Sequence, residues 1–326
     1  MTSPIVTQER PVASVPEAGT GLGRRRVCWH AGVLLAVLVG GLYLAHRHWA
    51  ALESGAGRLA GADQGWLLVG ATAALGTWAA SALAQQGAVV RRLPGSLLVA
   101  AQFAASAANH LLPAGLGAGA VNVRFLMRCG LPAGRSASAL AVKAGAGGAV
   151  RLALIAVLAP ACPGLLRLPD LTPTALAVAL GCLVLLAVLP ATPWWARCRR
   201  ALSVVLADLR GLHTRPARAA ALWGGSLAFA ALHSLVLISV TRAVGLPLPP
   251  LQVALLYLAA SSAAALLPTP GGLGSLDAAL VFALTLSGAP GAAAASAVLG
   301  YRLLTVWLPL LPGLLVLAVL VRRKAL

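Results

Sequence analysis

Long apolar runs recur along this sequence and constrain its fold more than any other feature. Most of them reach or exceed the length of about 17–25 residues that a helix needs to cross a bilayer. Because the hydrocarbon core offers the backbone no hydrogen-bond partners, such runs must form helices. The expected spans are about 27–45, 65–84, 133–160, 173–189 and 219–244, with a final long stretch at 291–321.

Composition indicates the same class of protein. The chain is 60% hydrophobic and only 10% charged, whereas a soluble domain is nearer half apolar and about a quarter charged. We therefore predict an all-α fold, a polytopic membrane helix bundle. Residues 1–26 are polar and end in three arginines, so we expect a disordered cytoplasmic tail there. A single transmembrane domain is expected to follow over residues 27–322.

The charge balance sets the expected orientation. The chain has 25 Lys and Arg residues against 7 Asp and Glu, a formal net charge of +18. The basic residues gather beside the apolar runs, at 24–26, 91–92, 196–218 and 322–324. The positive-inside rule places these segments, and hence both termini, in the cytoplasm. No basic patch is interleaved with aromatic residues, so we expect no nucleic-acid partner.

The basic connection at 196–218 leaves two interpretations open. Its leucines and valine recur at helical spacing with arginines elsewhere, which is typical of an interfacial amphipathic helix attracted to anionic lipid. An ordinary basic cytoplasmic loop accounts for the composition equally well. The scattered cysteines and histidines show no ligand spacing, so no metal and no cofactor are expected.

Two apolar segments are broken by proline and glycine at similar places. "LLPAGLG" at 111–117 matches "LLPTPGGLG" at 266–274, and in both cases a G-x-P motif follows at a similar distance. The pattern predicts two repeat units, at about 96–160 and 251–321. The residues expected to form the breaks are Pro113, Gly115, Gly117, Pro268, Pro270, Gly271, Gly272 and Gly274.

The positions of the basic segments predict that the two units are inverted relative to each other. If each broken segment enters and leaves on one side, the first pair starts and ends inside and the second starts and ends outside. This holds only if the long stretches at 133–160 and 291–321 each form one span. Paired, interrupted segments of opposite topology are typical of transporters with a site near the bilayer midplane. Irregular backbone at the breaks must line protein or a water-filled cavity.

One acid, Asp277, lies just past the second break, whereas the other acids lie in tails or connections. A carboxylate at the centre of a membrane helix costs about 3 kcal/mol on insertion scales, so it is a candidate for function. Alternatively, Ser275 caps a half-helix and Asp277 lies in its first turn, where the helix dipole favours an anion. Both interpretations hold if the capped carboxylate also pairs with a cation.

Several cations could serve as that partner or contact a ligand. We expect Arg302 and Arg124 to face the interior of the bundle. For Lys143 and Arg151, an inward position and snorkelling toward the interface remain equally open. Three polar residues flank the first break, namely Asn109, His110 and Asn122. Such side chains satisfy backbone groups freed by the break, which is the more frequent role, or contact a headgroup.

The segment from Leu266 to Gly313 resembles the C-terminal signature of the lysylphosphatidylglycerol synthase transmembrane region family, also called flippase-like. That signature reads P-T-P-G-G-x-G, an acid, A-x-L, an aromatic residue followed by Arg, then W-x-P and G. Segment 111–132 resembles the earlier P-x-G-x-G…R…G motif of the same family. The matching residues are Pro268, Pro270, Gly271, Gly272, Gly274, Asp277, Tyr301 and Arg302, with Arg124 in the earlier motif. The family usually has Glu where this chain has Asp277, which reaches less far.

The resemblance implies a lipid transporter of a bacterial plasma membrane. The lipid is expected to be an anionic or aminoacylated phospholipid or a glycolipid precursor. Arg124 and Arg302 are expected to contact phosphate, since guanidinium binds it bidentately. Asp277 would orient Arg302 or contact a cationic headgroup, and we add Asn109, Tyr301 and Lys143 to the substrate-binding candidates.

No enzymatic activity is expected. The full synthases of the family add a soluble aminoacyl-transferase domain, and this chain ends at Leu326. No phosphate-binding loop of the G-x-x-x-x-G-K-[ST] type occurs either, so a gradient or a lipid imbalance would have to drive transport.

Two alternatives remain open. One is a membrane-embedded enzyme acting on lipid headgroups, for which Asp277 and His110 are the only candidate acid–base pair. The other is a non-catalytic membrane partner of a lipid-modifying or glycosyl-transferring enzyme.

Overall fold

The structure is a computed structural model, and it describes only part of the chain. The described residues are 57, 61–111, 116–163, 203, 207, 210–211, 214–266 and 274–323. All of them belong to one of the two units into which the chain divides, residues 53–326. The predicted tail at 1–26, the spans at 27–45 and 173–189, and most of the 196–218 connection lie outside the described residues. So do Pro113, Gly115, Pro268, Pro270, Gly271 and Gly272.

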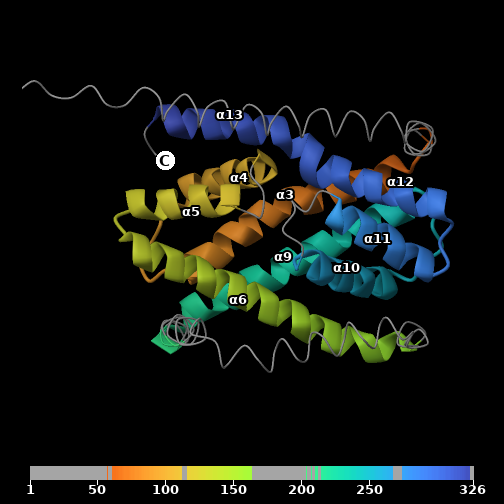
Figure 1. The fold of residues 1–326 in the computed structure, drawn as a ribbon, viewed down its shortest axis with the longest axis horizontal. Coiled ribbons are helices and arrows are strands. Elements are labelled where there is room, and N and C mark those ends of the chain that lie inside the picture. Colours follow the sequence, from red (N-terminus) through yellow and green to blue (C-terminus); the bar gives the residue numbers. More distant parts are fainter. Residues whose placement is uncertain are drawn as a thin grey trace, which may run out of the picture. The chain divides into compact units, whose positions relative to one another are not determined.

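The described residues form a bundle of α-helices with no strand among them (Figure 1). Four of its helical segments are long and apolar enough to cross a membrane: 64–87, 133–161, 216–243 and 291–322. The all-α polytopic prediction is therefore confirmed. The helices are α3 (Gln64–Gly87), α4 (Gly95–Leu111), α5 (Leu116–Arg128), α6 (Ala133–Leu158), α9 (Pro216–Ala243), α10 (Pro250–Ala264), α11 (Ser275–Leu286), α12 (Gly291–Arg302) and α13 (Leu308–Arg322).

Helices α3 and α9 pack against each other in antiparallel fashion, and glycines let their backbones approach closely. A Cβ atom on Gly87 would lie 2.2 Å from the backbone nitrogen of Leu222, and one on Gly225 would lie 2.4 Å from that of Ala84. Small residues at helix contacts are the usual device in membranes, where burial of apolar surface gives no driving force between helices. Helix α3 carries the polar residues Ser81 and Gln85, and helix α9 carries His233.

The two predicted repeat units contain the same order of elements. In the first, α4 and α5 precede a glycine turn and the long helix α6; in the second, α10 and α11 precede a glycine turn and α12–α13. The turn glycines, Gly130 (φ +86°) and Gly288 (φ +91°), both adopt left-handed backbone that favours glycine. Helix α6 and the α12–α13 segment run in opposite directions along the unit (Figure 1). An inverted arrangement requires this, and the membrane topology itself stays a prediction.

Both long stretches form single continuous helical segments, as the orientation argument requires. The second contains a π-helical turn, η6 (Leu303–Trp307), between α12 and α13. Its cause is Pro309, which has no N–H to donate to the carbonyl of Thr305 and whose ring crowds that carbonyl. The helix widens locally instead of breaking.

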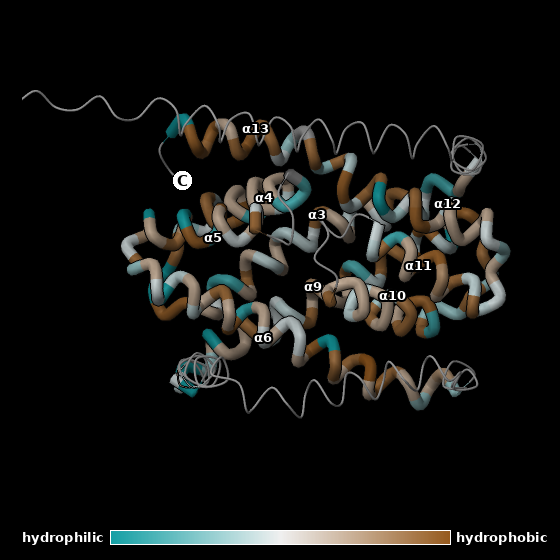
Figure 2. Tube along the Cα trace, viewed as in Figure 1, coloured by the Kyte–Doolittle hydropathy of each residue, from teal (hydrophilic) through white to brown (hydrophobic). Residues whose placement is uncertain are grey.

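Large apolar side chains are exposed on the two long helical segments. Leu152 and Val157 on α6 and Leu315 on α13 are each about two-thirds exposed, and Figure 2 shows the hydrophobic colour along both segments. Large residues packed inside include Leu237, Leu258 and Tyr301. The polar residues of the interior are therefore exceptions to an apolar background.

Candidate functional site

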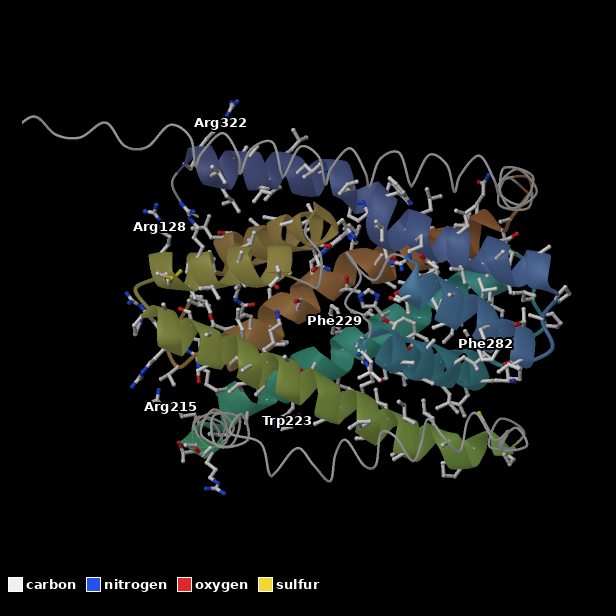
Figure 3. The ribbon with its side chains drawn as sticks, in the orientation of Figure 1. Arg128, Arg215, Trp223, Phe229, Phe282 and Arg322 are labelled. Atoms are coloured by element: carbon white, nitrogen blue, oxygen red, sulfur yellow. The ribbon has the colours of Figure 1, made fainter. Side chains whose placement is uncertain are left out.

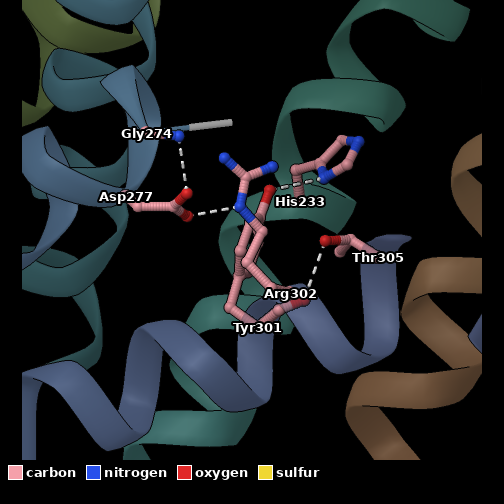
Figure 4. Close-up of polar contacts among 6 residues, drawn as sticks. All are labelled: His233, Gly274, Asp277, Tyr301, Arg302 and Thr305. Atoms are coloured by element: carbon pink, nitrogen blue, oxygen red, sulfur yellow. Dashed lines mark hydrogen bonds and ion pairs between the residues drawn. The ribbon is translucent and has the colours of Figure 1, made fainter. Parts of the chain in front are cut away.

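Asp277 and Arg302 form an ion pair between α11 and α12 (Figure 4). Arg302 donates from Nε to Asp277 Oδ1, and the backbone N–H of Gly274 donates to Asp277 Oδ2 at 2.9 Å. Arg302 is buried, with 6% of its surface exposed. A buried arginine needs a partner because desolvation makes an unpaired charge costly. The carboxylate therefore acts both as a cap and as a counter-charge, as the sequence allowed.

The N-cap of α11 lies one residue before the position that the sequence suggested. Gly274 is the N-cap, with φ +84°, and Ser275 is already the first helical residue. The expectation that Ser275 caps the helix was wrong. Asp277 lies at the third helical position and accepts from the N-cap backbone, which satisfies one orphan N–H of the helix start.

Tyr301 joins the ion pair to helix α9. Its hydroxyl lies 3.0 Å from Nδ1 of His233, and its carbonyl accepts a hydrogen bond of 2.7 Å from the Thr305 hydroxyl in the π-helical turn (Figure 4). The sequence selected Tyr301 as a ligand contact, but its hydroxyl is directed at a protein partner.

Lys143 on α6 is held by neutral oxygens. Its ammonium donates three hydrogen bonds: to Ser81 Oγ at 2.9 Å, to Gln85 Oε1 at 3.0 Å and to Gln102 Oε1 at 3.1 Å. In the part of the chain that the structure describes, no carboxylate takes part in this set. The side chain therefore faces inward, which decides the question that the sequence left open.

The groups that hold Lys143 also bind one another. Ser81 donates to Gln102 Oε1 at 2.8 Å, and the Gln102 amide donates to Gln85 Oε1 at 3.3 Å and to Asn122 Oδ1 at 2.9 Å. We call Ser81, Gln85, Gln102, Asn122 and Lys143 the lysine network. The network is held in place by four helices, because its members lie on α3, α4, α5 and α6.

A cavity of about 240 Å³ lies beside the lysine network and extends to His233 and Thr305. Its walls come from α3, α4, α5, α6, α9 and the π-helical turn. The polar lining residues are Thr77, Ser81, Gln102, Ser106, Asn109, Asn122, Lys143, His233 and Thr305. The cavity is thus lined both by Lys143 from α6 and by His233 from α9, which lies within hydrogen-bond distance of Tyr301.

The remaining predicted residues have mixed outcomes. Asn109 lines the cavity, and Asn122 donates to the Ala118 carbonyl inside α5 at 2.9 Å. Arg124 is exposed, so its expected inward position was wrong. The physical reason is helix phase: α5 turns Phe125 and Leu126 toward the core, and Arg124 lies on another face. A role for Arg124 in phosphate binding stays a prediction.

Three buried side-chain atoms have no hydrogen-bond partner in the described region: His110 Nδ1, Arg151 Nε and Gln85 Nε2. The sequence had singled out His110 and Arg151. No contact joins His110 to Asp277 among the described residues.

Sequence reasoning missed the uncharged members of the site, which are Ser81, Gln85, Gln102, His233 and Thr305. The available signal was their presence inside apolar runs, since polar groups in a span must find partners. Among the described residues, no group of three His, Cys, Asp or Glu side chains is arranged to hold a metal ion.

Comparison with protein families gives one result. A family model described as the lysylphosphatidylglycerol synthase TM region matches residues 29–313. No match to the chain was found among curated proteins.

Proposed function

The chain belongs to the lysylphosphatidylglycerol synthase TM region family, and we propose that it moves a lipid with a net-negative, phosphate-bearing headgroup between the leaflets of the membrane. The family supports an integral membrane protein associated with lipids. The interior of the bundle combines a cavity lined by many polar side chains with a cation, Lys143, that has no carboxylate partner among the described residues.

The observation that carries the proposal is the position of Lys143 in the cavity wall. Its ammonium donates to neutral oxygens, and no carboxylate of the described residues takes part, so in its protonated form Lys143 offers a positive charge that an anion can balance. A headgroup that crosses the membrane loses its hydration shell and needs replacement contacts. Asparagine, glutamine and serine side chains along the cavity supply hydrogen bonds while the acyl chains stay in hydrocarbon.

The Asp277–Arg302 pair has a different role in this proposal. Its charges compensate each other, and the pair joins the start of α11 to the end of α12. We assign it to positioning: it fixes the second broken segment beside Tyr301 and His233. Phosphate contact is thereby assigned to Lys143 rather than to Arg302, the residue that the sequence favoured.

Lipid transport in proteoliposomes tests the proposal. Purified wild-type protein is reconstituted and the rate of leaflet exchange is measured for fluorescent phosphatidylglycerol, lysyl-phosphatidylglycerol and phosphatidylcholine. We expect phosphatidylglycerol to move fastest, and Lys143→Met to slow it about tenfold, the equivalent of about 1.4 kcal/mol in the barrier. Arg242→Gln is the matched control, because it removes one exposed charge outside the cavity.

Absence of exchange for every lipid by folded protein would contradict the proposal. It would favour the alternative in which the chain is a non-catalytic partner of a lipid-modifying or glycosyl-transferring enzyme. Chemical change of a labelled lipid by the purified protein would instead favour the embedded enzyme.

A further inference from the structure

A second polar feature lies at one end of the bundle, away from the cavity. Two hollows of about 360 and 510 Å³ flank Arg91, and both are also lined by Gly130. Arg135 lines the first, and Arg92 and Arg128 line the second. We call the two hollows together the arginine cleft. Arg128, Arg215 and Arg322 all lie at this end of the unit (Figure 3).

Two hydrogen bonds fix the loop that forms one wall of the cleft. The Gln86 amide donates to the Arg91 carbonyl at 3.0 Å, and the Leu93 N–H donates to Gln86 Oε1 at 2.8 Å. The loop that carries Arg91 is therefore tied to the end of α3. On the opposite wall, Gly130 has φ +86°, which favours glycine, and Arg91 Nη1 lies 2.6 Å from the position that a Cβ would take there.

The lining combines charge with apolar surface. Four exposed arginines form the rim, whereas the floor of the first hollow contains Leu131 and Val142 and that of the second contains Phe125. Among the described residues the acids are Asp63, at the start of α3, and Asp277, which pairs with Arg302. The rim thus has no carboxylate partner in the described region. A charged rim over an apolar floor fits an amphiphile better than it fits a free anion.

A continuous face of two helices connects the cleft to the lysine network. On α6, Arg135 and Val142 are seven residues apart and both line the cleft, and Lys143 directly follows Val142. On α3, Ala88 lines the cleft and Gln85, less than one turn away, binds Lys143. A headgroup held at the arginines would therefore lie near the first polar residues of the interior.

We infer that the arginine cleft binds the headgroup of an anionic phospholipid and is the cytoplasmic loading site of the transport path. The binding is argued from the cleft itself, and the loading role rests on the proposed function. Guanidinium groups of Arg91 and Arg135 bind the phosphate, and the apolar floor contacts the glycerol and the first methylenes. This goes beyond the orienting effect of basic residues, which needs charge but no shaped cleft.

Native mass spectrometry of the purified full chain in detergent tests the binding. The protein is mixed with equal amounts of phosphatidylglycerol and phosphatidylcholine, and the lipid retained is compared between wild type, Arg91→Gln and Arg91→Gln/Arg135→Gln. We expect a preference for phosphatidylglycerol that falls about fivefold for each arginine removed. Arg322→Gln is the control, since this arginine lies at the same end but lines neither hollow.

Equal loss in Arg322→Gln, or no loss in the double variant, would overturn the inference. Displacement of phosphatidylglycerol by an equimolar amount of inorganic phosphate would also overturn it, because the site would then bind a free anion. Transport assays separate the two proposals. Normal transport with undiminished lipid retention in the double variant refutes the loading site alone, whereas cleft-dependent retention without any transport refutes the proposed function and leaves the binding site.

Discussion

The two broken units hold a buried cation in opposite ways. In the second unit, Arg302 is paired with a carboxylate, and the charges cancel. In the first unit, Lys143 donates to a hydroxyl and two amide oxygens, and it has no carboxylate partner among the described residues. A compensated pair joins helices and has little left to offer a ligand, whereas a solvated cation in a cavity wall can still attract an anion. In our proposal, the ion pair of the second unit is structural, and Lys143 of the first unit attracts the ligand.

The glycines at the two breaks extend this comparison and give the largest expected effect. Gly117 lies where α5 meets α4, and a Cβ there would be 1.9 Å from the Ala108 carbonyl oxygen. Gly274 has φ +84°, and a Cβ there would meet no described atom within 4 Å. We predict that Gly117→Ala lowers the free energy of unfolding by about 3 kcal/mol or more. Gly274→Ala should cost only about 1 kcal/mol of backbone strain.

Unfolding of both variants in mixed micelles checks this prediction. Gly119 is a suitable control, because a Cβ there meets nothing within 4 Å and its backbone is helical. Gly119→Ala should be neutral or slightly stabilising. Equal costs for Gly117→Ala and Gly274→Ala would show that the breaks are built alike.

Separation of the ion pair should have the next largest effect. Asp277→Asn leaves Arg302 buried without its counter-charge. Breaking a fully buried pair costs about 3–5 kcal/mol, but the Asp277 side chain is 32% exposed, so we expect a loss of about 2 kcal/mol in unfolding free energy. The Asp277→Asn/Arg302→Gln double variant should be more stable than the sum of the single losses indicates, because the removed groups act as a unit.

Asp63→Asn is the matched control for this cycle. Asp63 caps α3 from an exposed position and accepts from the N–H groups of Gly65 and Trp66. Asparagine caps helices about as well as aspartate, so loss of this charge should change stability by less than about 0.5 kcal/mol. Strict additivity of the two losses at Asp277 and Arg302 would argue against a coupled pair.

Removal of the lysine charge should have the smallest effect on stability. In Lys143→Met, Gln102 Oε1 still accepts from Ser81, and Gln85 Oε1 still accepts from Gln102. Ser81 Oγ loses the donor it has in Lys143, but its hydroxyl still donates to Gln102 Oε1, so we expect a change within about 1 kcal/mol. Thermal unfolding in detergent measures it. A loss as large as that of Asp277→Asn would mean that Lys143 is mainly structural.

Much of the fold was predictable because apolar runs report helices directly. The expected span at 219–244 and the helix Pro216–Ala243 differ by a few residues, and both long stretches are single segments. Asp277 was identified because an acid in an apolar run has a large energetic cost. The partners of Lys143 were not identified from the sequence, because Gln85 and Gln102 carry no charge and hydropathy does not indicate which face of a helix they occupy. The exposed position of Arg124 depends on the phase of a short helix after an irregular break, which spacing alone does not fix.

The central claim is that Lys143 contacts the headgroup whereas the Asp277–Arg302 pair is structural. A ratio of transport rates tests it most directly. The exchange rate of phosphatidylglycerol is divided by that of phosphatidylcholine in proteoliposomes, at a temperature where all variants are folded. We predict that Lys143→Met lowers this ratio about tenfold, and that Asp277→Asn reduces both rates while leaving the ratio unchanged. A ratio that changes in Asp277→Asn and is preserved in Lys143→Met would contradict the account and place the headgroup contact at the ion pair.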